Sequence, residues 1–296
     1  MSKHRALPAR LVETGHMAVK KCRYGTFMYN VNDRFIGRSL DLYGDWCDQE
    51  AVVLGQVLGA GDVVVDAGAN IGTHTVFFAG AVGDEGLVVA FEPQRLVFQI
   101  LCGNVALNGL RNVRCLMAAV GAERGHLIFP SLDPRQVLNF GAVKGSTEGV
   151  GEAVDVVPID ELDLQRCSLL KVDVEGMEVK VLAGARETIK RCHPVLYLEN
   201  DTVEGSRALL EAIDSIGYKG FWHVAPYYSA GNFFGNTDNV FGRFQPEANV
   251  LCVPKETPMA GLLTVEGLED NWTKAVERMS RTREASAKAS EGAARG

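Results

Sequence analysis

Residues 63–72 read Val-Val-Val-Asp-Ala-Gly-Ala-Asn-Ile-Gly and constrain the fold more than any other stretch of the chain. Three β-branched residues predict a short buried strand that ends at Asp66. Gly68 and Gly72 then permit a sharp turn into a helix over 74–82. A glycine lets a ligand approach the backbone closely, and the free N–H groups of a first helical turn attract an anionic group. This strand, turn and helix therefore predict a nucleotide-type binding site.

The turn departs from the dinucleotide-binding pattern. That pattern uses three glycines to seat a pyrophosphate on the helix N-terminus, whereas Asn70 takes the middle position here and Asp66 adds a carboxylate. A carboxylate repels a pyrophosphate but suits a ligand with an ammonium and a sulfonium, which describes S-adenosylmethionine. Glu92 closes a predicted strand over 87–91, where an acidic residue accepts hydrogen bonds from ribose hydroxyls. In the simpler interpretation, Asp66 caps the helix and Glu92 is a solvated strand end.

The composition fits a folded protein of one large domain or two small ones. Of the 296 residues, 47% are hydrophobic, which is ample for a core. The net charge of −7 argues against a general nucleic-acid binder, because such a protein needs a basic surface. Neither a signal-peptide core nor a long uninterrupted apolar run is apparent. We therefore expect a cytoplasmic protein without membrane insertion.

The seven cysteines form no C-x-x-C pair, and most lie in apolar runs. This pattern indicates reduced, packed thiols rather than a disulfide framework or a zinc site.

The N-terminal residues predict a small unit of their own. Residues 26–31 and 35–40 flank Asn32-Asp33, which predicts a hairpin, and 48–58 has apolar residues at helical spacing. Such a unit would cap the substrate side of the core. The predicted division of the chain is a hairpin and helix cap over 1–59, a cofactor-binding core over 60–258, and a C-terminal helix with a flexible tail over 259–296.

Short apolar strands alternate with helices along the core, which predicts a doubly wound, mostly parallel α/β sheet. An irregular insertion over 126–161 contains one strand at 154–158, and the stretch after Gly220 has no regular period. The C-terminal part predicts a helix over 268–283 and a frayed end over 285–296. The predicted strands are 63–65, 87–91, 113–120, 168–174, 195–198 and 249–253, and the predicted helices are 74–82, one ending at Asn108, 178–191 and 204–216.

Acidic residues recur at the carboxyl ends of the predicted strands, where open α/β sheets bind their ligands. Lys171 and Asp173 share one face of a strand that should otherwise be apolar. Burying either charge alone would cost several kcal/mol, roughly, so pairing or a polar pocket is required. Either an ion pair of Lys171 with Asp173 or Glu199 holds the sheet, or the acids act on a substrate. The strand-end residues are Asp66, Glu92, Asp173, Glu175, Glu199 and Asn200.

Several motifs together resemble the FkbM family of S-adenosylmethionine-dependent methyltransferases. They are Val-Asp-Ala-Gly-Ala-Asn-Ile-Gly at 65–72, Phe-Glu-Pro at 91–93, Asn104 with Asn108, and Leu-Lys-Val-Asp-Val-Glu-Gly-Met-Glu at 170–178. The resemblance covers roughly 25–254. It implies a class I methyltransferase (Rossmann-like) fold, with a seven-stranded sheet whose last strand, 249–253, is antiparallel. It also implies that the cofactor site is lined by Asp66, Gly68, Asn70, Gly72 and Glu92.

Family members mostly methylate hydroxyl groups on sugars or on secondary-metabolite scaffolds. A sugar hydroxyl is barely acidic, so a general base within hydrogen-bond reach would help the transfer. Asp173 is the first candidate base and His223 the second. Lys171 belongs to the same expected catalytic set. Glu175 and Glu199 are expected on the substrate side.

Eight of the chain's 23 aromatic residues fall within 221–244. Aromatic rings offer flat apolar surfaces to a sugar, so Trp222 and Tyr227 are expected substrate contacts. The alternative is that this loop folds its aromatic residues onto the core or against another subunit.

The sequence predicts an S-adenosylmethionine-dependent O-methyltransferase that acts on a hydroxyl of a glycan or a glycosylated metabolite. A divalent metal is conceivable at Asp173, Glu175, Glu199 and Asn200, but no diagnostic ligand spacing favours it. Two alternatives stay open: a nicotinamide-dependent oxidoreductase and a non-catalytic cofactor-binding scaffold. The expected partner is a small molecule or a glycan and not nucleic acid, and a homo-oligomer is left open.

Overall fold

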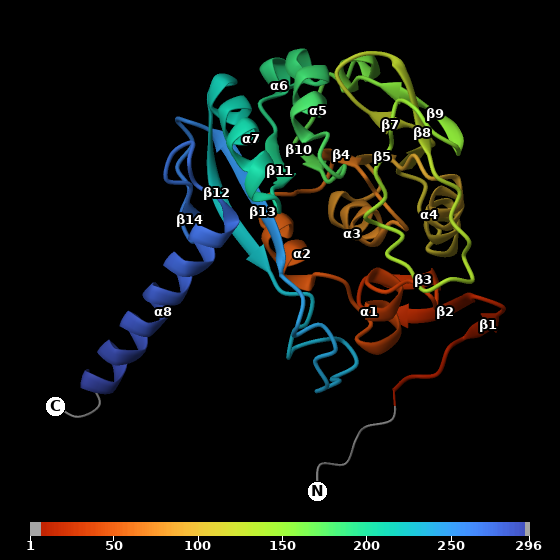
Figure 1. The fold of residues 1–296 in the computed structure, drawn as a ribbon, viewed down its shortest axis with the longest axis horizontal. Coiled ribbons are helices and arrows are strands. Elements are labelled where there is room, and N and C mark those ends of the chain that lie inside the picture. The colour runs from red at the N-terminus through yellow and green to blue at the C-terminus, as the bar shows by residue number, and fades with distance from the viewer. Residues whose placement is uncertain (1–6, 294–296) are drawn as a thin grey trace, which may run out of the picture.

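A twisted eight-stranded sheet forms the centre of the computed structural model, which describes residues 7–293 (Figure 1). The strand order is β14-β12-β13-β11-β10-β4-β5-β6. β13 is antiparallel to both of its neighbours, β11 and β12, while β4, β5, β6, β10 and β11 are mutually parallel. The strands are β4 (Val63–Ala67), β5 (Leu87–Phe91), β6 (Val113–Leu116), β10 (Leu169–Val172), β11 (Val195–Glu199), β12 (Tyr218–Ala225), β13 (Glu247–Pro254) and β14 (Leu263–Thr264).

This arrangement confirms the class I methyltransferase fold and the antiparallel strand predicted from the sequence. The predicted number of seven strands was one too low, because the two-residue strand β14 pairs with the outer edge of β12.

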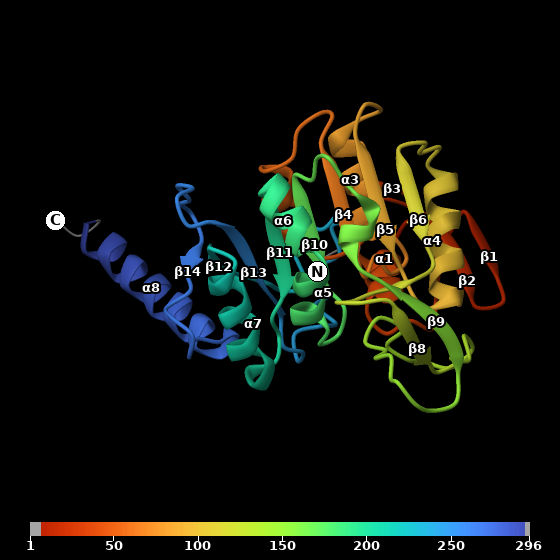
Figure 2. The ribbon, with the colours of Figure 1, turned by 90° about the horizontal axis from the view of Figure 1, so that it is seen from above.

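Helices cover both faces of the sheet (Figure 2). Val64 and Val88 pack with the helices of one face, whereas Val65 and Val89 belong to the core on the other face. All five residues of β4 are buried, as a central parallel strand requires. The first face carries α2 (Asp48–Gly55), α3 (Thr73–Val82) and α4 (Arg95–Leu107); the second carries α5 (Glu178–Gly184), α6 (Arg186–Cys192), α7 (Val203–Ser215) and the start of α8 (Trp272–Ala293).

The N-terminal hairpin differs from the prediction. β3 (Gly25–Asn30) pairs with β2 (Met17–Cys22) and not with 35–40, of which 36–40 lies in α1 (Ile36–Leu42); β1 (Val12–Thr14) adds a third strand. The cause lies in Asp33, a buried residue whose carboxylate accepts the N–H groups of Phe35 at 3.2 Å and Gly37 at 2.9 Å. It thereby satisfies donors that a helix start leaves free.

A second, three-stranded sheet has the order β7-β9-β8. The predicted strand 113–120 is split, because β6 belongs to the central sheet and β7 (Ala119–Val120) to the small one. The insertion expected to be mostly irregular contains β8 (Gly125–Phe129), β9 (Glu152–Val157) and the 3₁₀ turn η1 (Ile159–Leu162). The loop between β8 and β9 extends toward the carboxyl ends of the central strands.

The C-terminal part holds two further differences. β12 was missed, and the rest of the aromatic stretch, 226–246, folds against α1: Phe241 stacks on Phe35 with ring centroids 6.0 Å apart. α8 continues to Ala293 and projects from the body in both views (Figures 1 and 2), so most of the predicted frayed end is helical; 294–296 lie outside the described residues.

Each of the seven cysteines is a free thiol. None of the helices in residues 7–293 has the length and apolar character needed to cross a membrane.

Candidate active site

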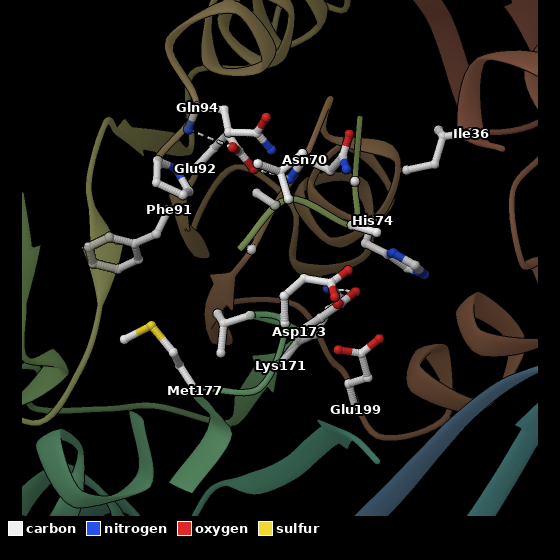
Figure 3. A pocket seen from close by; sticks show the side chains of 18 of the residues that line it. Ile36, Asn70, His74, Phe91, Glu92, Gln94, Lys171, Asp173, Met177 and Glu199 are labelled. Carbon is white, nitrogen blue, oxygen red and sulfur yellow. Dashed lines mark hydrogen bonds and ion pairs between the residues drawn. The ribbon is translucent and has the colours of Figure 1, made fainter. Parts of the chain in front are cut away.

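An open cavity of about 1180 Å³, its mouth included, lies at the carboxyl ends of β4, β5, β10 and β11. The chain proceeds outward from β4 to β5 and β6 and then returns to β10 on the other side of β4. The cavity therefore occupies the point where the strand order reverses, which is the usual ligand site of open α/β sheets. Figure 3 shows Glu92 and Asn70 on one side of this cavity and Asp173 and Glu199 on the opposite side.

The turn after β4 adopts the left-handed backbone that the sequence predicted, with φ values of +80° at Gly68, +50° at Asn70 and +88° at Gly72. Its glycines serve packing as much as ligand access. A Cβ on Gly68 would lie 1.7 Å from the carbonyl oxygen of Asp173, and one on Gly72 would lie 2.6 Å from Leu101 Cδ1. Gly68 and Asn70 line the cavity, whereas Gly72 lies behind it against α4.

Asp66 lies beneath the turn and does not line the cavity. Its side chain is fully buried, accepts a hydrogen bond from Thr75 Oγ1 at 2.6 Å and lies 3.4 Å from Lys171 Nζ. The expected contact with a cofactor is therefore replaced by an internal role: Asp66 holds Lys171 and the start of α3. A fully buried carboxylate needs such partners, because an isolated buried charge is unstable.

Glu92 is the buried acid on the opposite side of the turn. Its carboxylate accepts the N–H groups of Asn70 at 3.0 Å and Gln94 at 2.8 Å. Burial raises the pKa of Glu92 to about 7, although these two hydrogen bonds lower it. A carboxylate has about four acceptor positions, so Glu92 retains capacity for hydroxyl donors from a ligand in the cavity.

Lys171 and Asp173 form an ion pair at the cavity floor, with 3.2 Å between Lys171 Nζ and Asp173 Oδ2. Burial lowers the pKa of Lys171, but the carboxylates of Asp173 and Asp66 outweigh it and leave that pKa raised. Lys171 is therefore a buried cation paired with Asp173. The side chain of Asp173 is 44% exposed and reaches the cavity.

Further carboxyl groups crowd the same end of the cavity. Burial and neighbouring acids raise the pKa of Glu175 to about 7 and that of Glu199 well above its ordinary value. Glu50 and Glu247, which the sequence analysis missed, also line the cavity. Glu50 accepts a hydrogen bond from Asn249 at 3.0 Å and lies 3.1 Å from His74 Nε2.

Glu247 carried a signal that could have located it. An antiparallel strand begins at the edge where its parallel neighbours end, so the first residue of β13 meets the carboxyl ends of β10 and β11. The position of Glu50 was harder to predict from the sequence, since it reaches the site only through the tertiary packing of its helix, α2.

The structure separates the two expected aromatic substrate contacts. Tyr227 lines the cavity and stacks on Trp46, with ring centroids 5.1 Å apart. Trp222 is fully buried on the other face of the sheet, where its Nε1 donates a hydrogen bond to Asp270 at 2.9 Å. Its predicted substrate contact was wrong, because successive residues of β12 point to opposite faces.

His223, the second candidate base, lies in β12 and not in a substrate-side loop. Its Nδ1 is 2.7 Å from the hydroxyl of Tyr197, and the residue is buried behind the cavity wall. Burial lowers the pKa of His223, which keeps the imidazole neutral. His223 is absent from the cavity lining, so the geometry leaves Asp173 as the candidate base.

The loop between β8 and β9 closes one side of the cavity through Asn139 and 141–145. Gln94 Nε2 holds it by a 2.9 Å hydrogen bond to the carbonyl oxygen of Phe140. This role was not predictable from the local sequence, because the loop is glycine-rich and has no periodicity. Among residues 7–293, no group of three or more His, Cys, Asp or Glu side chains is arranged to hold a metal ion.

The cavity thus has two chemically distinct ends. One combines Glu92 with apolar side chains such as Phe91, Val120 and Met177, which suits a ligand with hydroxyls and a flat ring. The other presents carboxylates and the stacked rings of Trp46 and Tyr227. This arrangement can hold two ligands end to end, with Asp173 near their junction.

Comparison with known proteins shows which family the chain belongs to. The model of the methyltransferase FkbM domain matches residues 66–221. The chain is 30% identical over 183 residues to methyltransferase sdnD of Sordaria araneosa, a match that covers 51% of this chain and 70% of that protein. It is 31% identical over 139 residues to the hexuronic acid methyltransferase AglP of Haloferax volcanii, covering 46% of this chain but only 54% of that protein.

Among solved structures, the methyltransferase FkbM from Methylobacillus flagellatus KT aligns with a TM-score of 0.41 and 17% identity, over 65% of this chain and 43% of that one. The family match begins at Asp66 and ends at Phe221, so it spans the glycine turn, Glu92 and the Lys171–Asp173 pair. With more than half of its residues inside that match, the chain belongs to the FkbM family of methyltransferases.

Proposed function

We propose that this protein is an S-adenosylmethionine-dependent O-methyltransferase that methylates a hydroxyl of a sugar, a glycan or a glycosylated secondary metabolite. The observation that carries the proposal is the shared cavity in which the glycine turn and Glu92 face Asp173. The relative named as a hexuronic acid methyltransferase supports a sugar as acceptor.

The residues on the glycine-turn side fit this cofactor. Glu92 would accept hydrogen bonds from the ribose hydroxyls, and Phe91, Val120 and Met177 would enclose the adenine. Thr73 and His74 begin α3 and line the cavity, so the N–H groups of this first turn would receive the amino-acid carboxylate. The bound cofactor would supply a methyl group activated by a sulfonium.

The protein's own contribution would be alignment and proton removal. Trp46 and Tyr227 would position the flat face of a sugar, which orients its hydroxyl. Asp173 would accept the hydroxyl proton, and Lys171 would keep the carboxylate in place at the cavity floor. We further propose that 1–59 acts as a substrate-side cap on a core over 60–258, with 259–296 as a C-terminal helix and tail. Phe35, Trp46 and Glu50 reach the cavity from the cap.

Calorimetry with S-adenosylhomocysteine tests the cofactor assignment. We expect wild-type protein to bind it, and Glu92→Ala to weaken binding by about tenfold or more because the ribose loses its acceptor. Glu85→Ala is the matched control, since Glu85 is an exposed acid between α3 and β5. Absence of binding at high micromolar ligand, or equal affinity in wild type and Glu92→Ala, contradicts the assignment.

Turnover with a labelled methyl donor and a panel of sugars tests the base. We expect Asp173→Asn to retain affinity for S-adenosylhomocysteine and to lose about 10²–10⁴ in rate, the usual contribution of a general base. An Asp173→Asn variant with wild-type turnover would exclude Asp173 from this role. Cofactor binding without methyl transfer to any acceptor would instead favour a non-catalytic scaffold.

A further inference from the structure

A second hollow adjoins the cavity and carries the opposite charge. It is an open groove lined by three arginines, Arg34, Arg38 and Arg243, and bordered by Val137 and Phe244. Arg38 lies in α1, Arg34 precedes that helix, and Arg243 comes from the aromatic stretch, so only the folded chain brings them together. We call this hollow the arginine groove.

The three guanidinium groups have no ion-pair partner among the described residues, and all three arginines are exposed. Arg243 lies over the ring of Phe244, with 5.1 Å between Cζ and the ring centroid. In a chain with a net charge of −7, three unpaired arginines around one hollow are a local exception. These three arginines therefore form a positively charged site that could bind an anionic ligand.

The two acids of the arginine groove do not neutralise these arginines. Asp41 is held by Arg10 at 2.8 Å, by Lys20 at 3.0 Å and by a hydrogen bond from Tyr29 at 2.6 Å. Asp33 is buried and its carboxylate accepts backbone N–H groups at the start of α1. Both acids are therefore occupied inside the protein, and the guanidinium groups remain available to a ligand.

The arginine groove and the cavity share two walls. Phe35 lines the cavity and packs against Phe244 of the groove, with ring centroids 5.0 Å apart. On the other wall, Val137 lines the groove and Asn139 the cavity, two residues apart in one loop. The two hollows therefore lie next to each other, and an acceptor long enough to pass over Phe35 would reach both.

Charge decides how such a ligand would lie. The acidic end of the cavity is lined by five carboxyl groups, from Glu50, Asp173, Glu175, Glu199 and Glu247, with Lys144 and Lys171 as the lysines of the lining. An anionic group of the acceptor is therefore less favourable there than among the three arginines of the groove. Guanidinium groups bind phosphate oxygens through paired, charge-assisted hydrogen bonds, and three of them match more negative charge than one carboxylate carries. The hydroxyl end of an acceptor belongs in the cavity and a phosphorylated end in the arginine groove.

We propose that the arginine groove binds a phosphate or diphosphate group carried by the methyl acceptor. This inference rests on the proposed function, because it takes the cavity as the methyl-transfer site. The acceptor is then a phosphorylated sugar: its neutral ring reaches Asp173 and its anionic group stays on Arg34, Arg38 and Arg243.

Titration calorimetry with inorganic pyrophosphate tests the site, on full-length protein with and without saturating S-adenosylhomocysteine. We expect binding to wild type and a loss of about tenfold or more in Arg34→Gln/Arg38→Gln/Arg243→Gln. The control is Arg111→Gln, an exposed arginine beyond the end of α4. Equal pyrophosphate affinity in wild type and the triple variant, or no binding, overturns the inference.

Three further ligands identify the source of the phosphate: a hexose, its 1-phosphate and a nucleoside-diphosphate hexose. We expect both phosphorylated sugars to bind wild type more tightly than the hexose, and the tighter of the two distinguishes a monophosphate from a diphosphate acceptor. A hexose that binds as tightly as its 1-phosphate also overturns the inference. Binding of S-adenosylhomocysteine is measured on the same samples, so a failed arginine groove and a failed cofactor site give different results.

Discussion

Glu92 shows how one buried residue can couple cofactor binding to pH. Its carboxyl is nearly inaccessible, 3% exposed, and burial raises its pKa to about 7. In the ligand-free protein, this group is therefore protonated below neutral pH and ionised above it. Only the ionised form accepts hydrogen bonds at both oxygens, which is what the ribose hydroxyls of the proposed cofactor require.

We expect the affinity for S-adenosylhomocysteine to rise as the pH increases from 6 to 8, because less work is needed to ionise Glu92. The change should approach tenfold per pH unit below the pKa of about 7 and level off above it. Calorimetry across this range measures it. Glu92→Gln should bind more weakly and with a flat profile; a slope that survives in Glu92→Gln would assign the pH dependence to another group.

The residues of the site differ in how far the sequence could locate them. Asp173 and Glu199 were predictable as cavity residues, because parallel strands end along one edge and both residues lie at the carboxyl end of a predicted strand. Asp66 also lies at the carboxyl end of a strand, but its carboxylate forms an ion pair with Lys171 beneath the turn and does not reach the cavity. Such a difference depends on side-chain partners in the next strand, which the position in a strand does not reveal.

At the scale of elements, α4 is joined to β3 by two asparagines. Their side-chain amides hydrogen-bond to the backbone of β3, as a neighbouring strand would. Asn104 Oδ1 accepts the N–H of Met28 at 2.7 Å, and its Nδ2 donates to the carbonyl oxygens of Met28 at 3.0 Å and Ile71 at 2.7 Å. Asn108, one turn later, makes the same pair of bonds with the N–H and carbonyl of Thr26. The spacing of four residues follows from the helix, which places both amides on the face toward β3.

We expect Asn104→Ala to lower the free energy of unfolding by about 2–4 kcal/mol, because the fully buried Asn104 amide leaves three backbone groups without their partners, two of them part-buried and one buried. Asn108→Ala should cost less, since Asn108 is only half-buried and water can replace its amide. Urea denaturation followed by circular dichroism measures both, with Arg111→Ala as a surface control. Equal losses in the two asparagine variants would contradict the role given to burial.

Elements with clear periodicity were predictable, and elements that depend on distant partners were not. The strands β4 and β5 and the helix α3 follow from short β-branched runs and a glycine turn. Residues 35–40 were predicted as a strand because Asn32-Asp33 before them resembles a hairpin turn, whereas in the structure the Asp33 carboxylate accepts N–H groups at the start of a helix. β12 is buried along nearly its whole length, so its sequence lacks the alternation of apolar and polar residues that would predict a strand.

At the scale of the whole molecule, the cavity exists because distant parts of the chain converge on the sheet. The 226–246 segment is held to the N-terminal unit by Arg23, whose Nη2 donates to the carbonyl oxygen of Gly231 at 2.6 Å, and by Asp45, which accepts the N–H of Phe233 at 2.9 Å. This closure brings Tyr227 and Glu247 beside Trp46 and completes the acidic end. The concentration of carboxyl groups there is unfavourable for folding, which indicates a functional reason for it.

The acidic end should make the ligand-free protein less stable as the pH rises. Burial and the surrounding acids raise the pKa of Glu247 well above its ordinary value, and that of Glu175 to about 7. A carboxyl whose folded pKa is raised stabilises the fold fully below its unfolded pKa, about 4.5, and loses that contribution as the pH rises through the folded value. The loss from Glu175 therefore falls between about pH 4.5 and 7, and that from Glu247 extends above this window.

We expect Glu247→Gln to stabilise the ligand-free protein by about 1–2 kcal/mol at pH 8 and by much less at pH 5, because glutamine removes the buried charge but keeps an acceptor for the Tyr227 hydroxyl. Thermal melts at both pH values measure the difference, with the exposed Glu256→Gln as control. A gain of the same size at both pH values would show that packing, not charge, limits stability here. Glu247 lines the cavity on the acceptor side, so if it accepts a hydrogen bond from the acceptor, the stabilised Glu247→Gln variant should also turn over more slowly.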